Sequence, residues 1–188
     1  IAEVLEGRKA QFIAELELQG VSKKDAETEV DLSIDRLIYY AGWCDKYMQM
    51  YSSVNPVSGS YFNFSVPEPV GVVAVFAPQK SGLLGLVTQM ATIIAGGNTC
   101  VILAAEQLAL CAVTFAEVLA TSDVSGGVVN ILTGNQSELL FQFASHKDVN
   151  TILYCGDNQE TIKTIQELAI ENMKSVVVRE DSNYFDDK

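Results

Sequence analysis

Residues Pro69–Glu106 have the sequence PVGVVAVFAPQKSGLLGLVTQMATIIAGGNTCVILAAE. A hydrophobic strand is expected up to Pro78, an apolar helix up to the Gly96-Gly97 pair, and a second strand through Cys100-Val101-Ile102. Strands that are apolar throughout are typical of a parallel sheet covered on both faces. The segment therefore predicts a strand–helix–strand unit with a right-handed crossover between two parallel strands.

The alternation of strand and helix continues to the end of the chain. Strands that alternate with helices indicate an α/β fold, here a Rossmann-like, parallel five-stranded sheet flanked by helices. The expected strands are 70–77, 99–103, 128–132, 151–155 and 175–179. The expected helices are 83–95, 107–120, 136–145 and 158–171.

The region before the sheet has a different pattern. Two helices are expected in residues 1–50, the second running from a cap at Ser22 to about Met50. Residues 51–68 lose helical periodicity and predict an extended arm, and residues 69–188 form the Rossmann-like core. The buried stripe of the second helix is expected to contain Val30, Ile34, Leu37, Ile38, Ala41 and Cys44.

Composition restricts the partners of the chain. With 12 Lys and Arg against 24 Asp and Glu, the formal net charge is −12, so phosphate backbones are repelled and no nucleic-acid partner is expected. No apolar run reaches the roughly 18 residues of a membrane span. The 4 cysteines lack metal-ligand spacing and lie in apolar patterns, which indicates reduced core thiols, a cytoplasmic location and no metal site.

Three segments resemble one known family. Tyr39–Lys46 has the sequence YYAGWCDK, Phe62–Pro69 has the sequence FNFSVPEP, and both precede the Pro69–Glu106 unit. Together they resemble the nucleotide-binding domain of the aldehyde dehydrogenases, and most of all the degenerate second half of the double-length family sixteen members. The resemblance covers almost the whole chain, and it implies that the catalytic domain of such a protein would begin after Lys188.

The resemblance places the family's cofactor and substrate contacts on residues that differ here. Pro78, Gln79 and Lys80 fall on a Pro-Trp-Asn motif, so Lys80 replaces the amide that binds the oxyanion. Leu103 and Glu106 fall on the Lys and Glu that bind the adenosine ribose, and Leu103 cannot donate a hydrogen bond. Glu106 is kept, although it could also simply begin the next helix, where a carboxylate is favourable.

Two further segments of the resemblance concern the phosphates. Thr133–Gln136 replaces a loop with two glycines and keeps only Gly134. Gly156 is kept in the pyrophosphate segment, but Asp157 replaces a serine, so a carboxylate stands where a phosphate would bind. Asp157 would also be a good N-cap for the helix that follows. The sequence thus predicts a vestigial cleft formed by Pro78, Gln79, Lys80, Leu103, Glu106, Gly134, Gly156 and Asp157.

The catalytic groups that the resemblance implies are not matched. None of the 4 cysteines falls on the nucleophile position, and the general-base position falls on Arg179, although a one-residue shift would restore Glu180. We therefore expect a non-catalytic module with a degenerate NAD site, no bound cofactor (NAD or NADP in its ancestor), and a structural or assembly role in a larger protein. The alternative is a fragment of an NAD(P)-dependent aldehyde oxidoreductase whose catalytic cysteine domain lies outside this chain.

The arm carries aromatic residues in Ser60–Val66, namely Tyr61, Phe62 and Phe64. In the family this position holds a strand of a hairpin used in subunit assembly, whose companion strand comes from the distant C-terminus. An unpaired strand edge with aromatic side chains promotes association. We therefore expect the arm to fold back, to be disordered, or to pair with a second copy, and we expect the chain to self-associate as a dimer through this arm. The partner expected for the chain is thus a second copy of itself or the remainder of a larger dehydrogenase-like chain.

Overall fold

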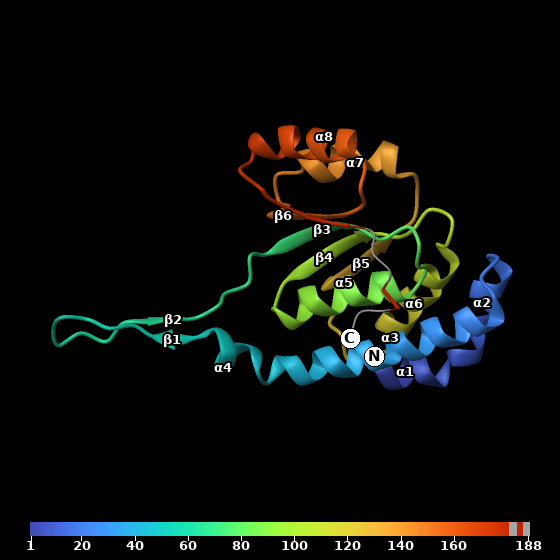
Figure 1. Cartoon of the computed structure of the whole chain (residues 1–188), viewed down its shortest axis with the longest axis horizontal. Coiled ribbons are helices and arrows are strands. Elements are labelled where there is room, and N and C mark those ends of the chain that lie inside the picture. Colours follow the sequence, from blue (N-terminus) through green and yellow to red (C-terminus); the bar gives the residue numbers. More distant parts are fainter. Residues whose placement is uncertain (181–183, 186–188) are drawn as a thin grey trace.

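The computed structural model describes residues 1–180, 184 and 185. Its centre is a parallel sheet of five strands in the order β5-β4-β3-β6-β7 (Figure 1). The first strand of this sheet in sequence, β3, is the central one. The next two strands, β4 and β5, lie on one side of β3, and the last two, β6 and β7, lie on the other side. The strands are β3 (Val72–Phe76), β4 (Thr99–Leu103), β5 (Val129–Leu132), β6 (Thr151–Cys155) and β7 (Ser175–Arg179). The predicted α/β fold with a parallel five-stranded sheet is confirmed.

Helices cover both faces of the sheet (Figure 1). α5 and α6 lie on one face with the N-terminal helices, and α7 and α8 lie on the other. Each face of the sheet therefore has its own hydrophobic core. Successive side chains of a strand point to opposite faces, so Val75 packs in the core beneath α5 and α6, and Phe76 packs in the core beneath α7 and α8. The four helices are α5 (Leu84–Ala95), α6 (Leu110–Ala120), α7 (Gln136–Ser145) and α8 (Gln159–Ile170). Within the described part of the chain, no helix is both long enough and apolar enough to cross a membrane.

The N-terminal region has shorter helices than the two predicted. They are α1 (Ala2–Gly7), α2 (Lys9–Leu18), α3 (Lys23–Cys44) and α4 (Tyr47–Tyr51). The break between α1 and α2 follows Gly7, because glycine weakens a helix. At this break the Arg8 guanidinium pairs with Glu117 of α6 at 2.7 Å.

The predicted inner stripe of α3 is correct over only part of its length. Val30, Ile34 and Leu37 are buried where α3 packs against α5. Ile38 is 59% exposed, however, and Ala41 and Cys44 are exposed as well, so their predicted burial is wrong. The reason is that they line an open groove between α1, α3 and α5 instead of a closed core.

The arm between α4 and β3 is a two-stranded hairpin that projects from the body (Figure 1). β1 (Ser53–Val54) pairs antiparallel with β2 (Phe64–Ser65), and the Asn55 backbone N–H donates to the Asn63 carbonyl at 2.8 Å. Of the three outcomes expected for the arm, the structure thus shows folding back on itself. The Phe62 and Phe64 rings lie 5.3 Å apart and are 74% and 56% exposed.

Candidate functional site

The carboxyl ends of the five strands lie at one edge of the sheet, and the loops that follow them carry most of the predicted site residues. In open α/β sheets, ligands bind at this edge beside the point where the strand order reverses, which here is between β3 and β6. The loop residues that meet here are Pro78, Gln79 and Lys80 after β3, Glu106 after β4, Gly134 after β5, and Gly156 and Asp157 after β6.

Leu103 is the one predicted site residue that lies within a strand and not in the loops at this edge. It is the last residue of β4, and its side chain is 1% exposed. It belongs to the apolar core between the sheet and α7–α8, together with Phe76 and Tyr154. Leu103 therefore packs the core and is not among the side chains that line the cleft above it.

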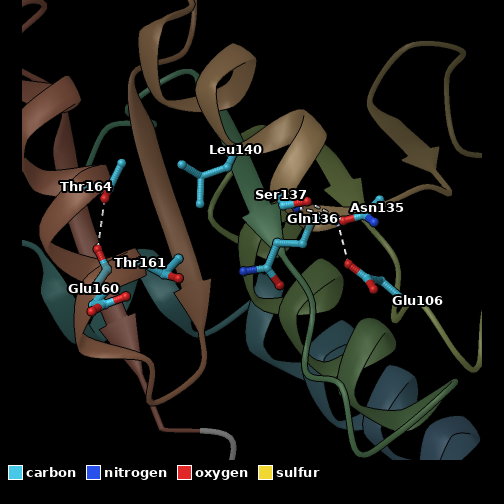
Figure 2. A pocket seen from close by; sticks show the side chains of 8 residues that line it. All are labelled: Glu106, Asn135, Gln136, Ser137, Leu140, Glu160, Thr161 and Thr164. Atoms are coloured by element: carbon cyan, nitrogen blue, oxygen red, sulfur yellow. Dashed lines mark hydrogen bonds between the residues drawn. The ribbon is translucent and has the colours of Figure 1, made fainter.

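A cleft of about 480 Å³ opens between the first turns of α7 and α8. In Figure 2, residues of α7 form one wall and residues of α8 the other, with Glu106 beside the start of α7. The lining residues are Glu106, Asn135, Gln136, Ser137, Leu140, Glu160, Thr161 and Thr164. Of these residues only Glu106 was among the predicted cleft residues, although the predicted phosphate loop Thr133–Gln136 includes Asn135 and Gln136. The residues of α8 were not predicted, because polar residues in a first helical turn are common to all capped helices. The available signal was a pair of Asn caps, one after β5 and one after β6, which are consecutive in the sequence but separated by β4 and β3 in the sheet.

Glu106 is held at the N-terminus of α7. Its Oε1 accepts a hydrogen bond from the Gln136 backbone N–H at 2.5 Å, where the helix dipole favours a negative charge. The Glu106 backbone N–H in turn donates to Gln79 Oε1 at 3.0 Å. The alternative in which Glu106 begins the next helix is wrong, because α6 begins only at Leu110. A carboxylate has about four acceptor positions, so Glu106 retains capacity for the hydroxyl groups of a ligand.

Both helices beside the cleft are capped by asparagine. Asn135 Oδ1 accepts from the Ser137 backbone N–H at 3.0 Å, and Asn158 Oδ1 accepts from the N–H groups of Glu160 and Thr161 at 3.0 and 3.1 Å. The prediction that Asp157 caps α8 is therefore wrong by one residue. Asp and Asn cap equally well, so the choice between neighbours depends on the packing of the helix. Asp157 is instead an exposed loop residue.

The N–H groups at the N-terminus of α5 donate hydrogen bonds to a carboxylate of the protein itself, that of Glu29. Glu29 of α3 is 2% exposed, and its Oε1 accepts from Ser81 Oγ at 2.7 Å and from the N–H groups of Leu83 and Leu84 at 2.8 and 3.1 Å. In glycine-rich dinucleotide-binding units, the N-terminus of this first helix holds the pyrophosphate. Because Glu29 fills that position, the N–H groups of Leu83 and Leu84 are not available to an anionic ligand.

The thiols do not supply a nucleophile at this edge. Burial raises the pKa of Cys100 to about 12, and burial followed by the charges of Glu15 and Glu29 raises the pKa of Cys111. Cys155 is 2% exposed, and the exposed Cys44 lies in the groove beside α1. Nucleophilic attack by cysteine requires an accessible thiolate. Over residues 1–180, 184 and 185, no cluster of His, Cys, Asp and Glu could hold a metal ion.

Comparison with known proteins gives consistent matches. The model of the aldehyde dehydrogenase family matches residues 1–183. The Bacillus subtilis protein DhaS is 34% identical over 181 residues, which cover 95% of this chain and 36% of DhaS. Human cytosolic 10-formyltetrahydrofolate dehydrogenase is 31% identical over 182 residues, covering 94% of this chain and 20% of that protein. The chain therefore spans about a third or less of the length of these relatives.

A solved structure matches the fold over the same length. The NAD⁺ complex of an aldehyde dehydrogenase from Bacillus cereus superposes with a TM-score of 0.88 and 26% identity, covering 95% of this chain and 36% of that one. The expectation that no cofactor binds is contradicted by this finding and is wrong. That expectation relied on Leu103 and Asp157. The structure places Leu103 in the hydrophobic core, and the N-cap of α8 is Asn158, so Asp157 lies one residue before the helix cap.

Proposed function

This chain belongs to the aldehyde dehydrogenase family, and from that premise we propose that it is the nucleotide-binding part of a dehydrogenase-like protein, with the adenosine half of NAD bound in the cleft between α7 and α8. The observation that carries the proposal is the Glu106 carboxylate, fixed at the start of α7 and exposed to the cleft. A cleft of about 480 Å³ is of the size that small ligands occupy.

The residues present fit a dinucleotide. Glu106 accepts hydrogen bonds from ribose hydroxyls, a role that dinucleotide-binding folds give to an acidic residue near a strand end. Leu140 offers an apolar contact for the base, and Thr161 and Thr164 offer hydroxyl groups on the opposite wall. When bound, NAD supplies the hydride acceptor for a dehydrogenase. Calorimetric titration with NAD should give saturable, one-to-one heat, and the absence of saturation at millimolar NAD contradicts the proposal.

The isolated chain should not oxidise aldehydes even with NAD bound. Thioester chemistry needs an activated thiol, and Cys100, Cys111 and Cys155 are buried while Cys44 lies away from the cleft. We therefore assign the reactive cysteine to a part of the whole protein outside residues 1–188. The reduced thiols also favour a cytoplasmic location. The check is the absorbance of reduced nicotinamide after addition of an aldehyde; a cysteine-dependent rise in this signal would contradict the assignment.

We also propose that the hairpin arm mediates assembly. Its exposed Phe64 lies in β2 and its exposed Phe62 two residues before, and together they form an apolar patch on a hairpin of two short strands. In such a small sheet each strand has an outer edge that can pair with another chain. Changing both to serine should raise the dimer dissociation constant at least tenfold, measured by light scattering over a concentration series. The melting temperature should change little, because the arm lies outside the core. A wild-type chain that stays monomeric at high concentration would refute this role.

A further inference from the structure

The side chain of Gln79 lies between the ends of β3 and β4. The last main-chain bond of this strand pair runs from the Ala77 N–H to the Leu103 carbonyl at 2.9 Å. Beyond it, Gln79 Nε2 donates to the Ala77 carbonyl at 2.9 Å, and Gln79 Oε1 accepts from the Glu106 N–H at 3.0 Å. The two strand ends are therefore joined by a side-chain carboxamide.

A carboxamide has the same donor and acceptor as a peptide group, so Gln79 acts as one extra rung of the β3–β4 ladder. Glu106 needs such support because it lies in the loop between β4 and α6 and belongs to neither. Its carboxylate then bonds the Gln136 N–H at the start of α7. The result is a continuous chain of hydrogen bonds from the end of β3, through Gln79 and Glu106, to the wall of the cleft.

We infer that Gln79 is a positioning residue for nucleotide binding: it holds Glu106 in place so that the carboxylate meets the adenosine ribose. This inference rests on the proposed function and adds to it a residue that is not among those that line the cleft. Gln79, which falls on the Trp of the family's Pro-Trp-Asn motif, is thereby a working part of the site.

The test compares two ligands that differ only at the ribose, ADP and 2′,3′-dideoxy-ADP, by calorimetric titration of the whole chain. Gln79→Leu keeps the size of the side chain and removes both hydrogen bonds. It should weaken ADP binding about five- to twentyfold, as expected for the loss of one or two hydrogen bonds. Binding of the dideoxy analogue should change by less than about twofold, because that ligand has no ribose hydroxyl for Glu106 to accept from.

Two further variants separate positioning from a general effect on the fold. In a Glu106→Ala background, Gln79→Leu should have no additional effect on ADP, because the residue that it positions is gone. The matched control is Gln142→Leu, the same change at an exposed position of α7, which should leave both affinities unaltered. Amide hydrogen exchange should speed up at Glu106 in Gln79→Leu and stay unchanged in the control.

The outcomes are distinct. Equal losses for ADP and the dideoxy analogue, or no loss for either, would overturn the role of Gln79 and leave the proposed function standing. A wild-type chain that binds neither ligand would overturn the proposed function and this inference with it. A selective loss for ADP that disappears in the Glu106→Ala background establishes the positioning role.

Discussion

Replacing Glu29 with alanine should lower the free energy of unfolding by about 3 kcal/mol, because three buried donors lose their common acceptor and each unpaired donor costs roughly 1–3 kcal/mol before water or local movement relieves it. The donors are the Ser81 hydroxyl and the N–H groups of Leu83 and Leu84. For a chain of this size the loss corresponds to about 6–12 °C in melting temperature, which thermal unfolding followed by circular dichroism measures.

Two variants give this prediction its controls. Glu29→Gln keeps an oxygen acceptor at the same distance from the backbone and should cost only about 1 kcal/mol. Glu27→Ala removes an exposed carboxylate from the same helix and should change stability by less than about 0.5 kcal/mol. A Glu29→Ala protein as stable as Glu27→Ala would show that the α5 N-terminus does not depend on this cap.

Replacing Glu106 with alanine should weaken NAD binding about ten- to hundredfold, the range for loss of hydrogen bonds to a charged group. Glu106 is exposed but also accepts from the Gln136 N–H, so its loss should cost only about 1 kcal/mol of stability, a few degrees in melting temperature. The loss of affinity should therefore be measured below the melting range, where both proteins are folded. NADP should bind the wild type less well than NAD, since its extra phosphate would enter a cleft lined by the carboxylates of Glu106 and Glu160. The ratio of NAD affinity to NADP affinity should be smaller in Glu106→Ala, because one of the two carboxylates is gone. Calorimetric titration with both dinucleotides measures the two effects.

The matched control for this prediction is Glu138→Ala. Glu138 also lies in the first turn of α7 and is exposed, but it does not line the cleft. Its removal should leave NAD affinity within about twofold, because exposed charges are screened. Equal losses in Glu138→Ala and Glu106→Ala would mean that the overall charge of the edge, and not a contact with the ribose, governs binding.

The strands of the sheet could be predicted from the sequence almost residue by residue. Expected strands at 99–103, 151–155 and 175–179 coincide with β4, β6 and β7. The reason is local: these runs are mostly apolar, contain β-branched residues and each begin after Asn or Lys, so little depends on distant parts of the chain. The N-terminal helices were less predictable, because burial of Ile38 and Cys44 depends on what covers the groove and not on their helical spacing.

The site was harder to predict because it is built from geometry between elements. The wall formed by Thr161 and Thr164 exists only because α8 packs opposite α7. The family motifs drew attention to Leu103, which is buried in the fold. They gave no indication of the hydrogen bond between the Glu106 N–H and the Gln79 side chain, because these residues are 27 positions apart in the sequence. Residue identities at single positions therefore suggested a lost cofactor, whereas the NAD⁺ complex of a structural relative indicates that the fold accommodates one.

Mapping amide chemical shifts of the isotope-labelled chain during titration with NAD asks at once whether the dinucleotide binds and where. We predict saturable shifts of the backbone amides around the cleft, at Glu106, Gln136, Ser137, Glu160 and Thr161. Shifts confined to the groove between α1, α3 and α5, or no saturable shift at millimolar NAD, would contradict the proposal that this chain is a nucleotide-binding domain with its site between α7 and α8.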